Sequence, residues 1–184
     1  MKKLALEEIG DQRLPAQTAR KVERFPIYVL LDNIRSLYNV GAIFRTADAA
    51  RIKKLIICGI TGPPPRKEID KTALGAVETV PWEYYPNAVD ALVDLKKQGV
   101  TILALEHTNK SQAHWTFDYK FPCCLLIGHE VWGIQDELLE HVDHAIEIPM
   151  YGAKHSLNAS VAFGIAIYKM VEIYLQSEIS GRNG

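Results

Sequence analysis

The sequence predicts a single α/β domain with a parallel sheet. Short apolar segments alternate with amphipathic helical segments, which is the order that βαβ units produce. The 184 residues are 48% hydrophobic, enough to bury a full core, and neither an internal repeat nor a linker divides them. We therefore expect one domain over residues 25–177, a polar, charged arm over residues 1–24 and a short polar tail over residues 178–184.

Five short apolar segments are expected to be the strands of this sheet. Each consists mainly of aliphatic residues without strict alternation with polar ones, which is typical of strands buried on both faces of a parallel sheet. They are Ile27–Leu31, Leu55–Cys58, Val100–Leu105, Cys123–Ile127 and Ala145–Ile148.

Three further segments have the apolar spacing of crossover helices. Val40–Ala50 places apolar side chains three and four positions apart, Asn87–Lys97 repeats that spacing, and Ser156–Leu175 is apolar over most of its length. Pro63–Pro65 interrupts regular structure, and with the polar residues up to Thr72 it predicts a mobile loop.

The composition argues against a membrane-spanning or secreted chain. No segment approaches the roughly 20 consecutive apolar residues of a membrane span, and the first ten residues carry acids where a signal peptide needs an apolar core. Cys58, Cys123 and Cys124 lie in apolar segments without the spacing of a metal site or a disulfide framework. We therefore expect a cytoplasmic protein with reduced cysteines, no bound metal and no membrane partner.

The charge is nearly balanced overall but is divided unevenly along the chain. The net charge is −1, yet residues 1–71 hold 14 Lys and Arg residues against 8 Asp and Glu residues. A basic half of this kind is consistent with contact to a phosphate backbone, and also with an ordinary solvated surface.

Polar residues follow three of the predicted strands, at the sheet edge where open α/β folds bind ligands. In the first block, Asn39 can cap the helix and Arg45 lies inside it. A helix of small and apolar residues rarely needs an arginine at that place, which makes Arg45 a candidate site residue. An ion pair between Arg45 and Asp48, three residues further on, is the structural alternative.

The second block follows the fourth predicted strand and has the outline of a pocket lined by the backbone. Gly128 ends the strand, Glu130 lies in the turn, and Gly133 permits an unusual backbone angle before the next helix. The block matches neither the GxGxxG pattern nor the Walker A sequence. His129 is expected at the surface rather than as a base, and Trp132 either covers an aromatic ligand or packs into the protein.

The third block, residues 148–165, joins a strand end, a polar loop and a helix start without interruption. Ser156 and Asn158 offer a hydroxyl and an amide at the turn, and the small side chains that follow allow another segment to approach closely. Taken alone, Ser156 is expected to be the N-cap of the long helix, a role worth about 1 kcal/mol.

Taken in order, the three blocks resemble the three sequence motifs of the SpoU-type, or TrmH-like, RNA ribose 2′-O-methyltransferases of the SPOUT class. The resemblance spans about residues 27–173, nearly the whole chain. It implies a parallel-sheet SPOUT fold with a C-terminal deep trefoil knot, S-adenosylmethionine bound in that knot, and a homodimer. The residues that carry it are Asn39 and Arg45, Gly128 and Glu130, and Ser156 and Asn158.

The resemblance also implies a role for each of these positions. Arg45 is placed at the ribose hydroxyl with Asn39 orienting it, and Glu130 matches the acidic residue of the second motif. Ser156 and Asn158 supply polar contacts near the active site. The cofactor pocket would be lined by the backbone around Leu126, Ile127 and Gly128, together with Ile148, Met150 and Leu157.

Two positions depart from the family pattern without removing a catalytic group. Ala159 stands where Val is more common, and Trp132 is bulkier than expected. The transfer requires no metal, because the methyl donor is already activated. A guanidinium normally stays protonated, so Arg45 either serves as the base or anchors the adjacent phosphate and stabilises the developing alkoxide.

The expected substrate is structured RNA, with tRNA preferred over rRNA. A base-directed SPOUT methyltransferase and a non-catalytic RNA-binding module remain alternatives, whereas a nucleotide-binding enzyme is disfavoured because Gly-rich phosphate loops are absent. The long apolar helix is either a fully buried core helix or part of a dimer interface.

Overall fold

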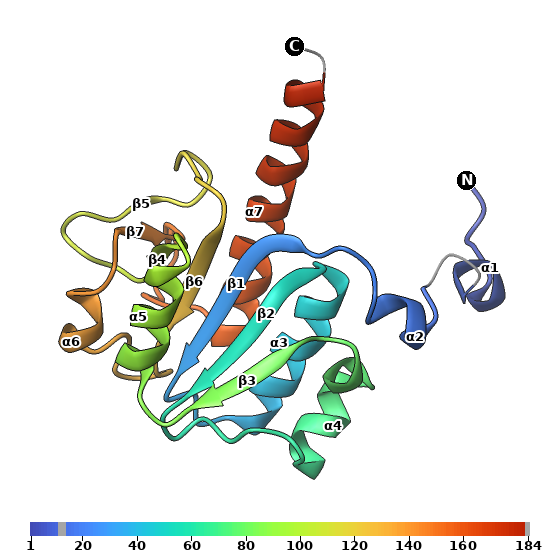
Figure 1. The fold of residues 1–184 in the computed structure, drawn as a ribbon, viewed down its shortest axis with the longest axis horizontal. Helices are drawn as coiled ribbons and strands as arrows, with labels where there is room; N and C mark the ends of the chain where they lie inside the picture. The colour runs from blue at the N-terminus through green and yellow to red at the C-terminus, as the bar shows by residue number, and fades with distance from the viewer. Residues whose placement is uncertain (11–13, 183–184) are drawn as a thin grey trace.

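The computed structural model describes residues 1–10 and 14–182, so that residues 11–13 of the expected arm and 183–184 of the expected tail lie outside it. The described residues form a sheet of seven parallel strands in the order β3-β2-β1-β6-β4-β7-β5 (Figure 1). The predicted α/β class with a parallel sheet is thereby confirmed. The strands are β1 Phe25–Asp32, β2 Ile52–Cys58, β3 Trp82–Tyr85, β4 Thr101–Leu105, β5 Gln112–Ala113, β6 Cys123–Ile127 and β7 His144–Glu147.

Helices cover both faces of the sheet. The buried side chains of α3 and α7 pack on one face, and those of α5 and α6 pack on the other (Figure 1). The helices are α1 Leu6–Gly10, α2 Ala16–Ala19, α3 Leu37–Ala49, α4 Lys67–Ala73, α5 Ala88–Lys97, α6 Asp136–Leu139 and α7 Ala159–Arg182, with a short 3-10 helix η1 at Ala76–Glu78.

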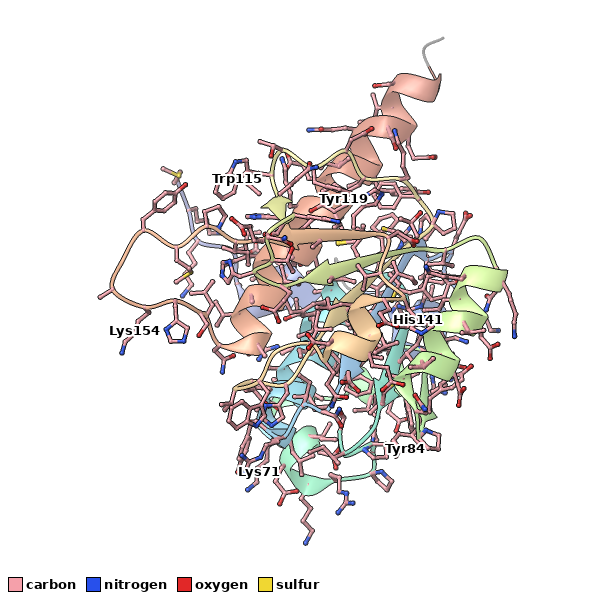
Figure 2. The ribbon with its side chains drawn as sticks, turned by 90° about the vertical axis from the view of Figure 1, so that its left-hand side faces the viewer. Lys71, Tyr84, Trp115, Tyr119, His141 and Lys154 are labelled. Carbon is pink, nitrogen blue, oxygen red and sulfur yellow. The ribbon has the colours of Figure 1, made fainter. Side chains whose placement is uncertain are left out.

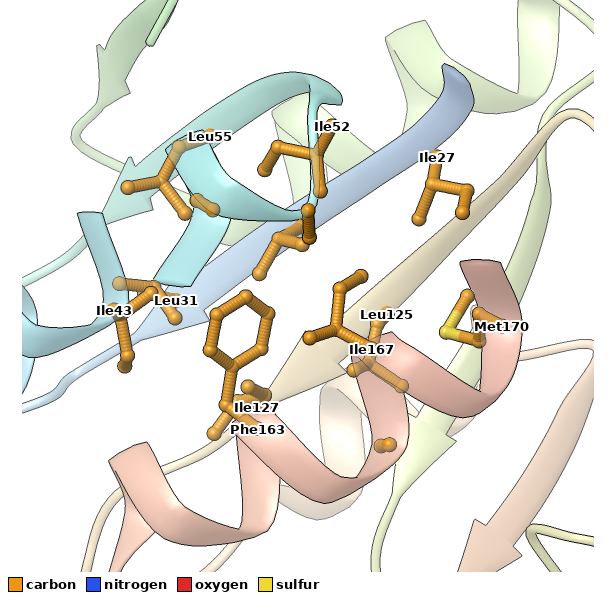
Figure 3. Close-up of a cluster of buried hydrophobic side chains, with 14 of the residues drawn as sticks. Ile27, Leu31, Ile43, Ile52, Leu55, Leu125, Ile127, Phe163, Ile167 and Met170 are labelled. Carbon is orange, nitrogen blue, oxygen red and sulfur yellow. The ribbon is translucent and has the colours of Figure 1, made fainter. Parts of the chain in front are cut away.

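The core has two layers because the central strands bury both of their faces. In β1, Val29 and Leu31 belong to the layer beneath α3 and α7, whereas Leu30 belongs to the layer beneath α5. Figure 3 shows Phe163 and Met170 of α7 directed into the first of these layers. Full burial of each such side chain contributes about 1.5–3 kcal/mol.

The segment after Pro63–Pro65 is a helix, so the mobile loop predicted there is wrong. The helix α4 buries Ile69 and Ala73, which are four positions apart and lie on one face. This face packs on α3 where Gly41 leaves the surface open. Two buried side chains in seven residues are too few to produce a recognisable apolar period.

Both edge strands of the sheet, β3 and β5, escape the sequence pattern. The strand β3 has no fully buried residue, and β5 has two residues. A buried apolar run therefore does not mark either of them. The five predicted strands are all present, with ends that differ by a few residues.

The long helix α7 begins three residues later than predicted and continues past the expected domain boundary at residue 177, to Arg182. Its N-terminal half packs under the sheet, while its C-terminal end extends away from it (Figure 1). Neither α7 nor any other helix in the described part of the chain is both long and apolar enough to cross a membrane.

The expected N-terminal arm contains α1 and α2 and is tied to the sheet by Arg24. The guanidinium of Arg24 donates hydrogen bonds to the carbonyl oxygens of Ala19, Ile52 and Thr79, at 3.1, 3.1 and 2.6 Å. One side chain thus links the arm, the start of β2 and the end of the η1 turn.

The strand β7 lies between β4 and β5, although β4 and β5 follow each other in the sequence. The connection over residues 106–111 therefore passes the carboxyl end of β7. The Glu106 N–H donates to the Ile146 carbonyl at 3.0 Å, and the Ser111 hydroxyl donates to the Glu147 carboxylate at 2.5 Å. These bonds fix the crossing at the sheet edge that also carries the candidate site.

We expect Gly41→Ala to destabilise the protein by about 2 kcal/mol, the usual cost of overpacking. A methyl group at position 41 would lie 2.4 Å from the Ile69 carbonyl oxygen and 2.1 Å from the Thr72 hydroxyl, so α4 would have to move. Urea unfolding measures the change. Gly152→Ala is the control, because its methyl group meets no atom within 4 Å. Equal stability of the two variants would contradict the packing described for α3 and α4.

Candidate active site

A cavity of about 1390 Å³ opens at the carboxyl ends of β4, β6 and β7. A parallel sheet gathers at this edge the residues that follow its strands. The walls of the cavity are the loop after β4, the turn after β6 and the segment between β7 and α7. Of the expected cofactor-pocket residues, Ile127, Gly128, Ile148, Met150 and Leu157 line it.

Leu126 is the expected pocket residue that does not reach this cavity. Its side chain is fully buried in the core layer beneath α5. Successive side chains alternate across a strand, so Leu126 points away from the face that Leu125 and Ile127 occupy. The role expected of Leu126 belongs to the backbone at the end of β6, and it stays a prediction.

Glu130 clamps the start of α3 to the turn after β6. Its two carboxylate oxygens accept hydrogen bonds from the backbone N–H groups of Arg35 at 2.9 Å and Ser36 at 3.0 Å, and from the Asn39 side-chain amide at 3.2 Å. A carboxylate at a helix N-terminus satisfies N–H groups that have no partner within the helix. Glu130 thus joins the first and second sequence blocks.

The same contacts decide the protonation state of Glu130. Partial burial alone would raise the pKa of its carboxyl group, but the hydrogen bonds from Arg35, Ser36 and Asn39 outweigh it and hold that pKa below the ordinary value. Glu130 is therefore ionised at neutral pH. It acts as a fixed hydrogen-bond acceptor and not as a proton donor.

Asn39 and Asn158 connect the first and third blocks. The Asn158 side-chain amide donates to Asn39 Oδ1 at 3.1 Å, and Asn158 Oδ1 accepts from the Ser160 N–H at 2.9 Å and from its hydroxyl at 2.7 Å. Asn158 therefore holds the start of α7, which corrects the cap expected at Ser156. Ser156 is exposed and lines the cavity.

The cap expected at Asn39 is likewise corrected. Ser36 caps α3 by accepting the Asn39 N–H at 3.3 Å, and Asn39 lies in the first turn of the helix. Asn39 Oδ1 is therefore not used by the N–H groups of its own helix, and it accepts from Asn158 while the NH2 group donates to Glu130.

Arg45 is the candidate residue that stands apart from this network. Its side chain is exposed on α3. Within the described residues it forms no ion pair, and Asp48, its expected partner, instead accepts a 2.6 Å hydrogen bond from the Thr79 hydroxyl. The alternative of an Arg45–Asp48 ion pair is therefore excluded, and the guanidinium is available to a ligand.

The turn after β6 is closed by its own backbone. His129 and Gly133 exchange N–H to carbonyl hydrogen bonds of 3.0 and 2.9 Å, and Gly133 has a φ of +67°, which favours glycine. His129 Nδ1 accepts from the N–H groups of Val131 and Trp132. Trp132 is 82% exposed, so the alternative in which it packs into this chain is excluded.

Glu106 is a site residue that the sequence blocks do not include. It follows the last residue of β4, and its Oε2 accepts the Ile134 N–H at 3.0 Å while Oε1 accepts the His107 N–H at 2.9 Å. An acidic residue at the end of a predicted buried strand is the signal that could have pointed to it.

The three cysteines are buried and unpaired, as expected of reduced core residues. Burial raises the pKa of the Cys58 and Cys123 thiols to about 12, which keeps them protonated and unreactive. In the part of the chain that the structure describes, His, Cys, Asp and Glu side chains do not gather in threes as a metal site would require.

Comparison with known proteins gives one match to a family model and several similar proteins. The model described as the SpoU rRNA Methylase family matches residues 26–168. The tRNA (guanosine(18)-2′-O)-methyltransferase of Thermus thermophilus is 32% identical over 164 residues, which cover 89% of this chain and 78% of that enzyme.

Two solved structures are similar over most of the chain. The TrmH/SpoU tRNA modifying enzyme of Aquifex aeolicus has a TM-score of 0.78 and 31% identity, with 90% of this chain and 84% of that chain covered. The AdoMet-bound rRNA methyltransferase of Sinorhizobium meliloti has a TM-score of 0.73 and 32% identity, with 82% of this chain and 58% of that chain covered.

We expect Glu130→Gln to lower the free energy of unfolding by about 1 kcal/mol at pH 7, because an amide supplies one acceptor where the carboxylate supplies two. The lowered pKa of Glu130 means that its contribution is present above pH 4.5 and is lost as the pH falls through the folded-state value. Urea unfolding should therefore show a smaller difference in the free energy of unfolding between the wild-type protein and Glu130→Gln at pH 3.5 than at pH 7. Glu23→Gln, at an exposed carboxylate, is the control. A destabilisation by Glu130→Gln that is the same at both pH values would count against the contacts described for Glu130.

Proposed function

Because the chain belongs to the SpoU rRNA methylase family, we propose that it transfers a methyl group from S-adenosylmethionine to a ribose 2′-hydroxyl of RNA. The family expected from the three sequence blocks is confirmed, and with it the reaction class and the cofactor. The contact of Asn39 with Glu130 and Asn158 carries the proposal, because it joins all three blocks beside the cavity at the carboxyl edge of the sheet.

The residues around the cavity fit S-adenosylmethionine. Ile127, Ile148 and Leu157 offer apolar surface for the adenosine. The turn from Gly128 to Gly133 offers backbone carbonyl oxygens as acceptors, because most of its N–H groups are already paired within the turn. We propose that these residues and Met150 hold the cofactor, with Ser156 as a polar contact. When bound, the cofactor supplies an electrophilic methyl group on a sulfonium.

Arg45 is proposed to hold the reacting ribose. Guanidinium groups carry a positive charge in proteins, so an arginine suits anchoring of the adjacent phosphate and stabilisation of negative charge on the ribose oxygen better than abstraction of a proton. The exposure of Arg45 and its lack of an ion pair among the described residues support this role. Asn39, already fixed by Glu130 and Asn158, would then orient the ribose.

Exposed cations beside α3 support a nucleic-acid substrate. Arg35 precedes α3, and Arg66, Lys67 and Lys71 belong to α4 or to its start, which packs on α3 through Gly41. None of these four forms an ion pair within the described residues, although Glu68 and Asp70 are nearby in the sequence. We propose that the phosphates of the RNA substrate pass along this side of the site, with tRNA as the first candidate and rRNA as the second.

A homodimer is proposed from the exposed side of α7. Val161, Ile165 and Tyr168 are 50, 40 and 52% exposed, and their spacing of four and three residues places them on one stripe of the helix. The stripe begins next to Leu157, in the cavity wall. A second copy of the chain would cover it and bring the two cavities to the interface. The alternative of a fully buried core helix is excluded for this stripe.

The trefoil knot is proposed from the crossing at β7. The chain leaves β7 past the connection over residues 106–111 and then reaches α7, which packs on the layer formed by β1 and β6. Passage of residues 148–158 through that connection would thread the chain. In Figure 2 the segment with Lys154 stands out from the body, where it could close over a ligand.

We also propose a cytoplasmic location, since RNA and reduced thiols occur there.

Ribose methylation of RNA tests the function directly. We expect the protein with labelled S-adenosylmethionine and total RNA to yield nuclease-resistant dinucleotides, because a 2′-O-methyl group removes the nucleophile for cleavage, and mass spectrometry then maps the site. Arg45→Ala should reduce transfer at least about 100-fold, with cofactor affinity by calorimetry unchanged. Lys53→Ala, at an exposed cation of β2, is the control.

The outcomes separate the alternatives. Methylation of a base would favour a base-directed enzyme. RNA binding by a protein that does not bind S-adenosylmethionine would favour a non-catalytic module. Lost cofactor binding by Arg45→Ala, or unchanged turnover, would overturn the role given to that residue.

For the dimer, we expect Ile165→Glu to give a monomer, because a carboxylate on the apolar stripe would be buried without a partner at the interface. Light scattering at micromolar concentration measures the mass, with Ser177→Glu on another side of α7 as the control. A monomeric wild-type protein would contradict the dimer.

A further inference from the structure

The Glu106 side chain lies where three parts of the cavity wall meet. It follows β4, its carboxylate contacts the end of the turn after β6 at Ile134, and its backbone N–H donates to Ile146 of β7. Glu106 is half-buried and lines the cavity itself. One residue therefore connects the carboxyl ends of all three strands that surround the cofactor space.

A carboxylate suits this place better than any isosteric group. Oε2 accepts the Ile134 N–H at 3.0 Å and Oε1 accepts the His107 N–H at 2.9 Å, so both oxygens face donors. A glutamine would turn an N–H group toward one of those donors, and an apolar residue would leave both unpaired.

The turn is shaped to admit this carboxylate. A methyl group at Gly133 would lie 2.3 Å from Glu106 Oε2, so a side chain there would displace the carboxylate from Ile134. The two hydrogen bonds between His129 and Gly133 close the other side of the turn. The backbone from Gly128 to Ile134 is thus held both across the turn and from β4.

We propose that Glu106 is a positioning residue for the cofactor: it holds the turn after β6 in the conformation that binds S-adenosylmethionine, without itself taking part in the transfer. This inference rests on the proposed function, because the turn is assigned there to the cofactor. A preformed turn binds a ligand more tightly, since ordering of its backbone does not have to accompany binding.

Glu106→Gln tests the proposal through a split between cofactor affinity and turnover. We expect the Kd for S-adenosylmethionine to rise about tenfold, as loss of one charge-assisted hydrogen bond implies. The turnover at saturating cofactor should stay within about twofold, because Arg45, Asn39 and the RNA surface are untouched. Glu140→Gln removes the same charge from the surface beyond α6 and should bind the cofactor as the wild-type protein does.

Two outcomes would overturn the proposal: an unchanged Kd for Glu106→Gln, or a turnover at saturating cofactor that falls well beyond about twofold. If the variant fails to fold, hydrogen exchange on the cofactor-free wild-type protein tests the proposal instead. The Ile134 N–H donates to Glu106, so a turn held by Glu106 should protect that amide from exchange. Exchange of that amide at the rate of an exposed loop would also overturn the proposal. A wild-type protein that binds no S-adenosylmethionine would instead refute the proposed function.

Discussion

The side-chain amide of Asn39 is the contact on which the arrangement of the site depends. An amide offers a donor and an acceptor at the end of one short side chain. Asn39 uses the donor on the Glu130 carboxylate and the acceptor on the Asn158 amide. An aspartate would place two acceptors against Glu130, and an apolar residue would contact neither partner. A single side chain therefore links the start of α3 to the turn after β6 and to the start of α7.

The parallel sheet makes this contact possible between residues far apart in the chain. Asn39 lies 91 residues from Glu130 and 119 residues from Asn158. Closing loops of that length costs chain entropy that a few exposed hydrogen bonds do not recover. The two core layers supply the difference, because their buried side chains fix β1, β6 and α7 relative to one another. The site is thus a product of the core, and its polar residues add orientation.

Much of this architecture follows from local pattern. Buried strands such as β6 and the crossover helix α5 are recognisable because whole faces are apolar. The helix α4 and the edge strands β3 and β5 are not, since few of their side chains are buried. Within the site, the blocks identify Glu130 and Asn158, but the choice of Asn158 over Ser156 as the helix cap depends on where α7 starts. Glu106 lies outside the blocks. It contacts the backbone N–H of Ile134, so the residue type at position 134 does not reveal the contact.

Synthesis of the chain releases β4, β5 and β6 before the strand that separates two of them exists. Until β7 emerges, the facing edges of β4 and β5 present N–H and C=O groups with no strand between them. Pairing that waits for distant residues is slow compared with local helix formation. Because β5 pairs with β7 alone, it can join the sheet only after β7 has been synthesised. Until then β4 is an edge strand of the nascent sheet, with one row of its backbone groups unpaired.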